Sequence, residues 1–298
     1  MRTLVTLQIA DLIRRYDALG ADIRRLVGDT REVSLVEDET GLRMWRPLIL
    51  GDGEFYRQLS EHNPWYYAPE KREYDVAARF LGGDDLLEVG CGEGHFAAWV
   101  KNAHYTGLEL SEHAVASAQG RGLRVLRQDF AVFADEHPGC FDRVCSFQVL
   151  EHLPAPAMYF RAAHRALRDG GLLITAVPSE DSYLGSQHDD CLNAPPHHVS
   201  RWTDDCLKRY PETFGFQLHD LVHLPVEQGH AQRLIHAFVS RTLLRPSPRA
   251  SGLLERLQRR AVVSLLRSLP ADVPIPADFF IPGHTVLAVH RRVELKDQ

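Results

Sequence analysis

Residues 86–96 read Leu86-Leu87-Glu88-Val89-Gly90-Cys91-Gly92-Glu93-Gly94-His95-Phe96, and the fold follows from this stretch. A short apolar run ends in an acidic residue, three glycines then stand at every second position, and the apolar-periodic residues 96–100 follow. This order predicts a strand, a tight glycine-rich turn and a helix, an arrangement that lets the backbone approach a nucleotide closely.

The glycine spacing and the acid before it indicate what kind of nucleotide binds. The dinucleotide fingerprint G-x-G-x-x-G has its last glycine one place later than the E-x-G-x-G-x-G pattern of this chain. Glu88 stands before the glycines, where a carboxylate repels a pyrophosphate and attracts a cationic ligand. The pattern therefore disfavours an NAD-binding oxidoreductase and favours a positively charged nucleoside without phosphates. S-adenosylmethionine, a sulfonium with an ammonium group, fits that description.

With this motif the chain resembles the class I S-adenosylmethionine-dependent methyltransferases. Further predicted strands at 104–109, 123–128, 141–147 and 172–177 alternate with helical segments, and this rhythm predicts a parallel, doubly wound α/β sheet. The resemblance implies a Rossmann-like sheet of seven strands, in which strand seven, at 284–293, is antiparallel beside strand five. The likeness covers roughly residues 67–216 and the final strand.

The chain divides into four predicted segments: a helix, hairpin and aromatic cap at 1–68, the methyltransferase core at 69–228, a helical insertion between strands six and seven at 229–275, and the last strand with a tail at 276–298. Apolar side chains at helical spacing in 4–26 predict the first helix. Alternation in 33–36 and 42–45 around a turn at 38–41 predicts the hairpin. The helix is either an arm that forms a homodimer or a helix that packs on the core, and the sequence leaves both open.

Three acids stand at the ends of consecutive predicted strands. In an open parallel sheet the ligand lies over the carboxyl ends of the strands, so Glu88, Glu109 and Asp129 should line one edge in order. Glu109, about 20 residues beyond the loop, is where a doubly wound fold places the acid that accepts the ribose hydroxyls. The resemblance implies that Asp129 accepts from the adenine amino group and that Phe130 packs on the ring.

Alanine at Glu109 or Asp129 is then predicted to weaken cofactor binding with a nearly unchanged melting curve. The residues predicted to bind S-adenosylmethionine are Glu88, Gly90, Cys91, Gly92, Gly94, Glu109, Leu110, Asp129, Phe130, Phe147, Gln148 and Tyr67.

Two histidine-containing pairs are the candidates for chemistry at the acceptor. Glu151-His152 follows predicted strand four, next to the expected position of the methyl group, and His197-His198 lies on the loop after strand five. In one interpretation a histidine, His152 first and then His198 or His197, is the general base that an alcohol acceptor needs. In another, Glu151, His152 and His198 bind a divalent cation that lowers the pKa of the acceptor. In a third, His152 only orients its neighbours.

The cation hypothesis also draws on a resemblance. Gln148-x-x-Glu151-His152 with the distant His198-x-x-x-Trp202 is similar to the metal site of the small-RNA 2′-O-methyltransferases. In that site the first position is Glu, and this chain has Gln148, which removes one anionic ligand.

Composition and charge argue against several classes of protein. A net charge of −6 and a pI near 6.2 argue against a protein whose main ligand is nucleic acid. Five cysteines without a CxxC pair indicate reduced thiols of a cytoplasmic protein, and no apolar run of membrane-spanning length or secretory signal is seen. Seven arginines and one acid in 241–267 predict a basic amphipathic helix, for which packing on the domain is favoured over peripheral contact with an anionic membrane.

These observations predict a methyltransferase that acts on a hydroxyl of a small molecule, sugar or glycan precursor. The choice of acceptor rests on the Glu-His and His-His pairs and on a broad likeness to methyltransferases of small metabolites, quinones and sugars. The alternatives are N-methylation and RNA 2′-O-methylation. In a different class of function, the chain would bind S-adenosylmethionine without turnover, as a sensor or partner subunit.

Overall fold

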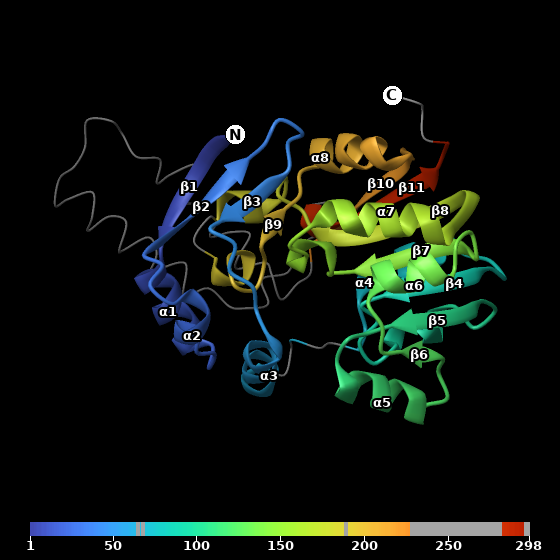
Figure 1. The fold of residues 1–298 in the computed structure, drawn as a ribbon, viewed down its shortest axis with the longest axis horizontal. Helices are drawn as coiled ribbons and strands as arrows, with labels where there is room; N and C mark the ends of the chain where they lie inside the picture. The colour runs from blue at the N-terminus through green and yellow to red at the C-terminus, as the bar shows by residue number, and fades with distance from the viewer. Residues whose placement is uncertain (64–65, 67–68, 188–189, 227–281, 295–298) are drawn as a thin grey trace.

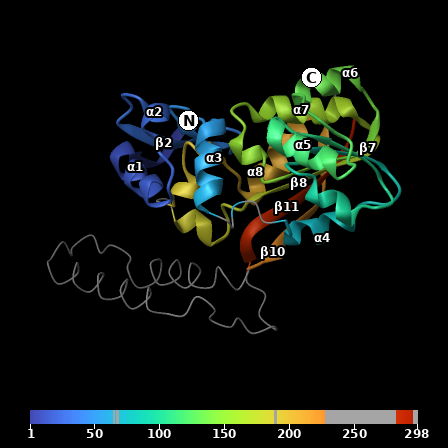
Figure 2. The same ribbon diagram turned by 90° about the horizontal axis from the view of Figure 1, so that it is seen from below.

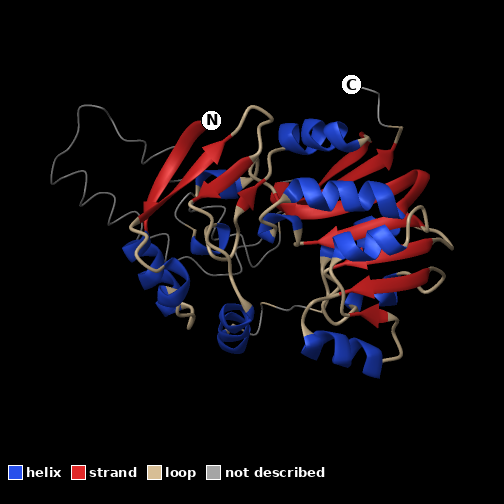
Figure 3. Cartoon of the chain, viewed as in Figure 1, coloured by secondary structure: helices blue, strands red, loops and turns tan. Residues whose placement is uncertain are grey.

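The computed structural model describes residues 1–63, 66, 69–187, 190–226 and 282–294 (Figure 1). The predicted helical insertion at 229–275, with its basic stretch, and Tyr67 lie outside the described residues. Within the described part, the strands form one sheet of seven and one of four, with helices around them (Figure 3).

The seven-stranded sheet forms the core and confirms the predicted fold class. Its inner strands run parallel, and β11 is antiparallel to both of its neighbours, β8 and β10. The chain changes its direction of winding on either side of β4, which is where open α/β sheets bind ligands. In spatial order the strands are β10 (Phe216–Pro225), β11 (Pro282–Arg292), β8 (Leu167–Pro178), β7 (Phe141–Phe147), β4 (Asp85–Val89), β5 (His104–Leu108) and β6 (Val125–Leu126).

Helices cover both faces of this sheet, with α7 and α4 on opposite sides (Figure 2). Successive strand residues point to opposite faces, so Leu87 joins the core cluster under α6 and α7 while Leu86 joins the cluster under α4. The segments that pack on the sheet or follow its strands are α4 (Arg72–Ala78), η1 (His95–Trp99), α5 (Glu112–Gly120), α6 (Phe130–Glu136), α7 (Pro156–Ala166), α8 (Asp204–Arg209) and η5 (Tyr210–Phe214).

Strands three and five differ from their predicted bounds. Strand three keeps only the two residues of β6. Helix α7 ends at Ala166 instead of 168, and β8 begins at once, before the two glycines that were predicted to cap the helix. The register is irregular there: Phe141 pairs with Leu167 and Arg143 with Leu172, and Gly170 takes a φ of 74° inside the strand.

The four-stranded sheet has the order β1-β2-β3-β9, and every neighbouring pair in it is antiparallel. The predicted hairpin is confirmed, with Leu35 opposite Trp45 and Val36 opposite Met44. The predicted helix from residue 4 is wrong in its first part, because the β-branched residues near the N-terminus add a strand to the hairpin. The elements are β1 (Arg2–Gln8), α1 (Ile9–Ala18), α2 (Arg24–Val27), β2 (Glu32–Glu37), β3 (Arg43–Arg46), α3 (Gly53–His62) and β9 (Ser200–Arg201).

Helix α1 packs on its own chain. Its apolar residues Ile9, Leu12 and Tyr16 are buried in a cluster that also contains Cys191 and Ala194, from the loop after β8. Helix α1 thus packs on the N-terminal sheet and on the loop after β8, while a homodimer through this helix stays a prediction. None of the helices in the described part of the chain is both long and apolar enough to cross a bilayer.

Candidate functional site

The glycine loop joins β4 to η1 and has the conformation that only glycine adopts easily. Gly90, Gly92 and Gly94 have φ values of 68°, 53° and 74°. A Cβ on Gly90 would lie 2.6 Å from the Val149 side chain, so packing requires that glycine. A Cβ on Gly92 would meet nothing within 4 Å, so the backbone there is open to a ligand. Of the other residues predicted on this loop, Cys91 is buried in a small core cluster.

Glu109 follows β5 and braces the loop from the neighbouring strand. Its Oε2 accepts the Gly92 N–H at 2.9 Å, and its Oε1 accepts the Leu110 and Ser111 N–H groups at 2.7 and 2.8 Å. A carboxylate has about four acceptor positions, so these three bonds leave capacity for a hydroxyl. The Leu110 side chain beside it is 64% exposed and gives an apolar surface at the same edge.

Asp129 follows β6 and caps helix α6. Its Oδ1 accepts the Ala131 and Val132 N–H groups at 2.8 and 3.2 Å. Its Oδ2 has no hydrogen bond to any residue the structure describes. Phe130, predicted to pack on the adenine ring, is buried in the core with its ring centroid 5.6 Å from that of Tyr159, and its contact with the cofactor stays a prediction. The exposed apolar side chain next to Asp129 is Val132, at 52%.

Glu88 is buried at the end of β4. Its Oε2 accepts the Tyr105 hydroxyl at 2.5 Å. Burial raises the pKa of Glu88 to about 8, and the Tyr105 hydrogen bond and the charge of Lys71 lower it. A cationic ligand beside this carboxyl would favour its ionised form, as expected from the sequence.

The chemistry of this strand edge fits S-adenosylmethionine, because it combines the glycine loop, the acids and the exposed apolar side chains. The open backbone at Gly92 admits a nucleoside, Glu109 and Asp129 offer acceptors, and the buried acid before the glycines favours a cation. Phe147, which was also predicted to bind, is a core residue instead, with its ring centroid 4.6 Å from that of Phe96.

The turn after β7 is strained at Gln148. This residue has a φ of 59°, the only positive φ of a non-glycine residue in the described ranges. Its N–H donates to Ala176 O at 2.9 Å and its Nε2 to Glu73 Oε1 at 3.3 Å, so the side chain faces α4. The turn leads directly into η2 (Leu150–His152), which carries the predicted Glu-His pair.

The structure brings the three predicted histidines together. One ring nitrogen from each of His152, His197 and His198 lies within 4.8 Å of the others. His152 Nδ1 is 2.6 Å from His197 O, and because a carbonyl only accepts, the Nδ1 carries the proton. Burial lowers the pKa of His152 to about 4, so the ring is neutral near pH 7. Its Nε2 therefore presents a lone pair.

Glu151 lies beside the histidines with no hydrogen-bond partner for either carboxylate oxygen in the described part of the chain. Its side chain is 1% exposed, and Oε1 is 4.0 Å from His198 Nε2. Burial raises its pKa to about 8. A buried carboxyl without partners is costly unless a ligand supplies them.

Several residues near this cluster were not predicted. Tyr56 Oη lies 3.2 Å from His152 Nδ1, Tyr66 Oη lies 2.7 Å from His197 Nε2, and Asn193 Oδ1 lies 3.2 Å from His198 Nδ1. Their sequence neighbourhoods show only aromatic and polar composition. The two tyrosine contacts join residues 96 and 131 positions apart, so no local spacing could have indicated them, whereas Asn193 and His198 are five positions apart.

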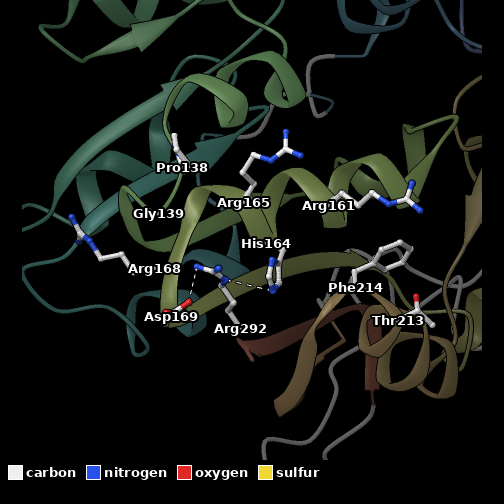
Figure 4. Close-up of a pocket in the computed structure, with 10 residues that line it drawn as sticks. All are labelled: Pro138, Gly139, Arg161, His164, Arg165, Arg168, Asp169, Thr213, Phe214 and Arg292. Carbon is white, nitrogen blue, oxygen red and sulfur yellow. Dashed lines mark hydrogen bonds and ion pairs between the residues drawn. The ribbon is translucent and has the colours of Figure 1, made fainter. Parts of the chain in front are cut away.

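A surface hollow of about 860 Å³ lies at the other edge of the sheet (Figure 4). Gly139, just before β7, and Asp169, near the start of β8, place it at the amino ends of those strands. Most of its arginines are paired with acids, as Arg165 with Asp135 and Arg292 with Asp169. It therefore does not belong to the site at the carboxyl ends. Its lining is Pro138, Gly139, Arg161, His164, Arg165, Arg168, Asp169, Thr213, Phe214 and Arg292.

Comparisons with known proteins agree with this geometry. A family model described as a methyltransferase domain matches residues 60–221. A Mycolicibacterium smegmatis protein named a probable S-adenosylmethionine-dependent methyltransferase is 29% identical over 195 residues, 62% of this chain and 74% of that one. The ubiquinone biosynthesis O-methyltransferase of Pseudomonas aeruginosa is 35% identical over 117 residues, 35% of this chain and 49%, about half, of that enzyme. A solved S-adenosylmethionine-dependent methyltransferase of Archaeoglobus fulgidus aligns with a TM-score of 0.52 and 16% identity over 80% of this chain and 100% of that one, a likeness of fold.

Proposed function

From its place in the S-adenosylmethionine-dependent methyltransferase family, to which this chain belongs, we propose that it methylates a hydroxyl of a small-molecule acceptor, a sugar or a glycan precursor. When bound, S-adenosylmethionine would supply a methyl group on a sulfonium: the acceptor oxygen bonds to the methyl carbon in line as the carbon–sulfur bond breaks, the neutral thioether leaves, and the hydroxyl proton passes to a base. Glu88, Gly92, Glu109 and Asp129 would hold this cofactor at the carboxyl ends of β4, β5 and β6.

The observation that carries the choice of a hydroxyl is the state of His152. A neutral alcohol is a weak nucleophile and gains from a base that takes its proton. His152 is neutral and its Nδ1–H donates to His197 O, so its Nε2 lone pair is available to accept a proton. This supports His152 as the general base, and a relative named as an O-methyltransferase supports the same class of acceptor.

The test is turnover with methyl-labelled S-adenosylmethionine and a panel of sugars, phenols, alcohols and amines. We expect a methyl ether as the product. In His152→Gln we expect kcat to fall about 10² to 10⁴-fold, the usual contribution of a general base, with the cofactor Kd unchanged. His113→Gln, at an exposed position on α5, is the matched control and should keep full activity. Products methylated only on nitrogen, or full activity in His152→Gln, would contradict the proposal. Cofactor binding without any methyl transfer would instead support a sensor.

A second candidate, a divalent cation on Glu151, His152 and His198, is favoured by one specific observation. His152 and His198 each donate their Nδ1–H to an oxygen, His197 O and Asn193 Oδ1, which leaves both Nε2 atoms unprotonated, and His198 Nε2 lies 4.0 Å from Oε1 of the unpartnered Glu151. Metal-binding histidines are oriented in this way, and two imidazoles with one carboxylate suit a divalent metal. A cation there would lower the pKa of a coordinated hydroxyl.

Mn²⁺ binding, followed by its electron paramagnetic resonance signal, tests this candidate without an acceptor. We expect one bound Mn²⁺ per wild-type chain and none in Glu151→Gln or His198→Gln. Glu180→Gln is not a suitable control because its ion pair is buried, so exposed Glu112→Gln serves instead. Wild-type protein that binds no Mn²⁺ and keeps its turnover in EDTA would eliminate the cation and leave His152 as the base.

A further inference from the structure

The loop that carries His197 and His198 is held between two parts of the molecule. On one side, Val199 N–H donates to Glu151 O at 2.9 Å, in η2 directly after the turn that follows β7. On the other, Trp45 N–H donates to Val199 O at 2.9 Å, and Gly51 N–H donates to Pro196 O at 2.9 Å. The N-terminal segment and the turn after β7 thus meet through this loop.

Both ring nitrogens of His197 are already occupied. Its Nδ1 lies 2.7 Å from Leu192 O, so that nitrogen carries the proton and donates it to the carbonyl. Its Nε2 lies 2.7 Å from Tyr66 Oη and accepts the hydroxyl proton. The His197 ring is buried and burial lowers its pKa to about 3. This ring has no lone pair left for an acceptor.

The carbonyl of the same residue has a different role. His197 O accepts the Nδ1–H of His152 at 2.6 Å. The Tyr56 hydroxyl oxygen, 3.2 Å from the same nitrogen, is a second acceptor for that proton, and the Tyr56 and His152 rings meet edge to face. If His152 carried its proton on Nε2 instead, its Nδ1 lone pair would face the His197 carbonyl oxygen at 2.6 Å, which is repulsive.

We propose that His197 is a positioning residue, locked by Tyr66 and acting through its main-chain carbonyl, which keeps the Nε2 of His152 free to accept a proton. The inference rests on the proposed function for the role of His152, and it makes the N-terminal segment part of the acceptor half of the site. Of the three histidines predicted as candidate bases, His197 is assigned an indirect role. The orientation is the one seen when a histidine base is held by an acceptor on its other nitrogen.

The test compares His197→Ala with His197→Gln in protein treated with EDTA. A glutamine amide offers an NH2 group that donates and an oxygen that accepts, so it can replace both hydrogen bonds of the neutral ring but cannot act as a base. The readout is the ¹⁵N NMR spectrum of labelled protein, in which protonated and unprotonated ring nitrogens of His152 have distinct shifts. We expect a single Nδ1–H tautomer in the wild type and in His197→Gln, and a mixture of tautomers in His197→Ala.

Turnover gives the second readout. We expect kcat to fall at least tenfold in His197→Ala and to be restored to within about tenfold of the wild type in His197→Gln, the range of one or two hydrogen bonds. A single tautomer of His152 in His197→Ala would overturn the proposal, as would a loss of turnover in His197→Gln as large as that in His152→Gln. Should His197→Ala fail to fold, Tyr66→Phe removes only the Nε2 partner and should also give mixed tautomers; Tyr210→Phe is its control, since the Tyr210 hydroxyl has no hydrogen bond to a described residue.

The two readouts separate this inference from the proposed function. The tautomer needs no acceptor, so mixed tautomers in His197→Ala support the positioning role even if no hydroxyl substrate is found. Conversely, methyl ether formation with an unchanged tautomer supports the function and rejects the role of His197.

Discussion

At Asp129 the two oxygens of one carboxylate have different surroundings. Oδ1 caps helix α6 through two N–H groups, while Oδ2 has no hydrogen bond to a described residue and is available for the proposed contact with the cofactor. An N-cap is worth about 1 kcal/mol of folding free energy. The sequence-based expectation of a nearly unchanged melting curve in Asp129→Ala is therefore replaced, because the loss of the cap should be visible in stability.

The two roles can be separated by a pair of substitutions. Asp129→Ala should lower the free energy of unfolding by about 1 kcal/mol and also weaken S-adenosylmethionine binding. Asp129→Ser keeps a good cap but removes the second oxygen, so it should weaken binding about tenfold with little loss of stability. Urea unfolding and calorimetric titration measure the two effects. Equal affinity in Asp129→Ser and the wild type would show that this residue is only a helix cap.

Glu109 shows why the acids could be predicted and their hydrogen bonds could not. Its position after a strand, about 20 residues beyond the glycines, follows from the period of a βαβ unit. The bond from Gly92 N–H depends on how far the loop bends toward β5, which the three positive φ values determine. The same bend turns Cys91 inward, so a residue of the motif became part of the core.

At the scale of elements, the short strand β9 connects the two sheets. Arg201 on β9 is buried, with its guanidinium 3.4 Å from Glu180 Oε1 and 5.2 Å from the Trp45 ring centre. Its N–H groups also donate to Asn193 O at 2.8 and 3.0 Å. Burial lowers the pKa of Arg201 and the Glu180 carboxylate opposes that effect. The ion pair thus holds the histidine loop against the hairpin.

Removing one partner of the Arg201–Glu180 pair should strongly lower the free energy of unfolding. Glu180→Gln leaves a buried guanidinium without its anion, a change that typically costs 3–5 kcal/mol, about ten times the loss expected at an exposed pair. Glu112→Gln, which removes the partner of exposed Arg127, is the control and should change the free energy of unfolding by less than about 1 kcal/mol. Guanidinium chloride unfolding of both variants gives the comparison. Similar values for the two would mean that the Arg201 charge is well solvated.

Elements with a strong local period were predicted best. The hairpin around Leu35 and Trp45 follows from alternation, and the strand from Phe141 to Phe147 has the bounds predicted for it. Strand β1 was missed because its leucines also fit a helical spacing, and only pairing with β2 decides between the two. Strand β9 has two residues and no signal of its own; it exists because β3 offers it a partner.

In the whole molecule, the proposed cofactor-binding and acceptor-binding halves of the site differ in how they are assembled. The cofactor-binding half uses acids at or just after the ends of three successive strands, β4, β5 and β6, so order in the sequence becomes order in space. The acceptor half joins the N-terminal segment, the turn after β7 and the loop after β8; in Figure 1 the arrowheads of β5 and β7 point toward α3 and the four-stranded sheet. Contacts between segments far apart in the sequence form that half. The sequence therefore indicated its histidines but not the residues that hold them in place.

Buried ionisable groups make the stability of the whole fold depend on pH. Burial raises the pKa of Glu88 to about 8 from 4.5, so the folded chain keeps a proton that the unfolded chain has lost between these values. Its contribution to stability is complete below about pH 4.5 and is lost as the pH rises through about 8. His290 has the opposite sign: burial lowers its pKa to about 4 from 6.5, so its contribution is complete above about pH 6.5 and is lost as the pH falls through about 4.

The free energy of unfolding should therefore fall between about pH 6.5 and 8.5, with a slope of up to about 1.4 kcal/mol per pH unit from Glu88 alone. The Glu151 carboxyl, whose pKa is also raised to about 8, adds a slope of the same sign in protein freed of divalent cations. Glu88→Gln should reduce the slope by the share of one proton, while Glu70→Gln, at an exposed position, should leave it unchanged. Urea titrations at half-unit pH intervals measure the slope. If stability were constant or rising across this range in the wild type, Glu88 would be ionised in the folded chain, and a cation would gain no extra attraction from it as the pH rises.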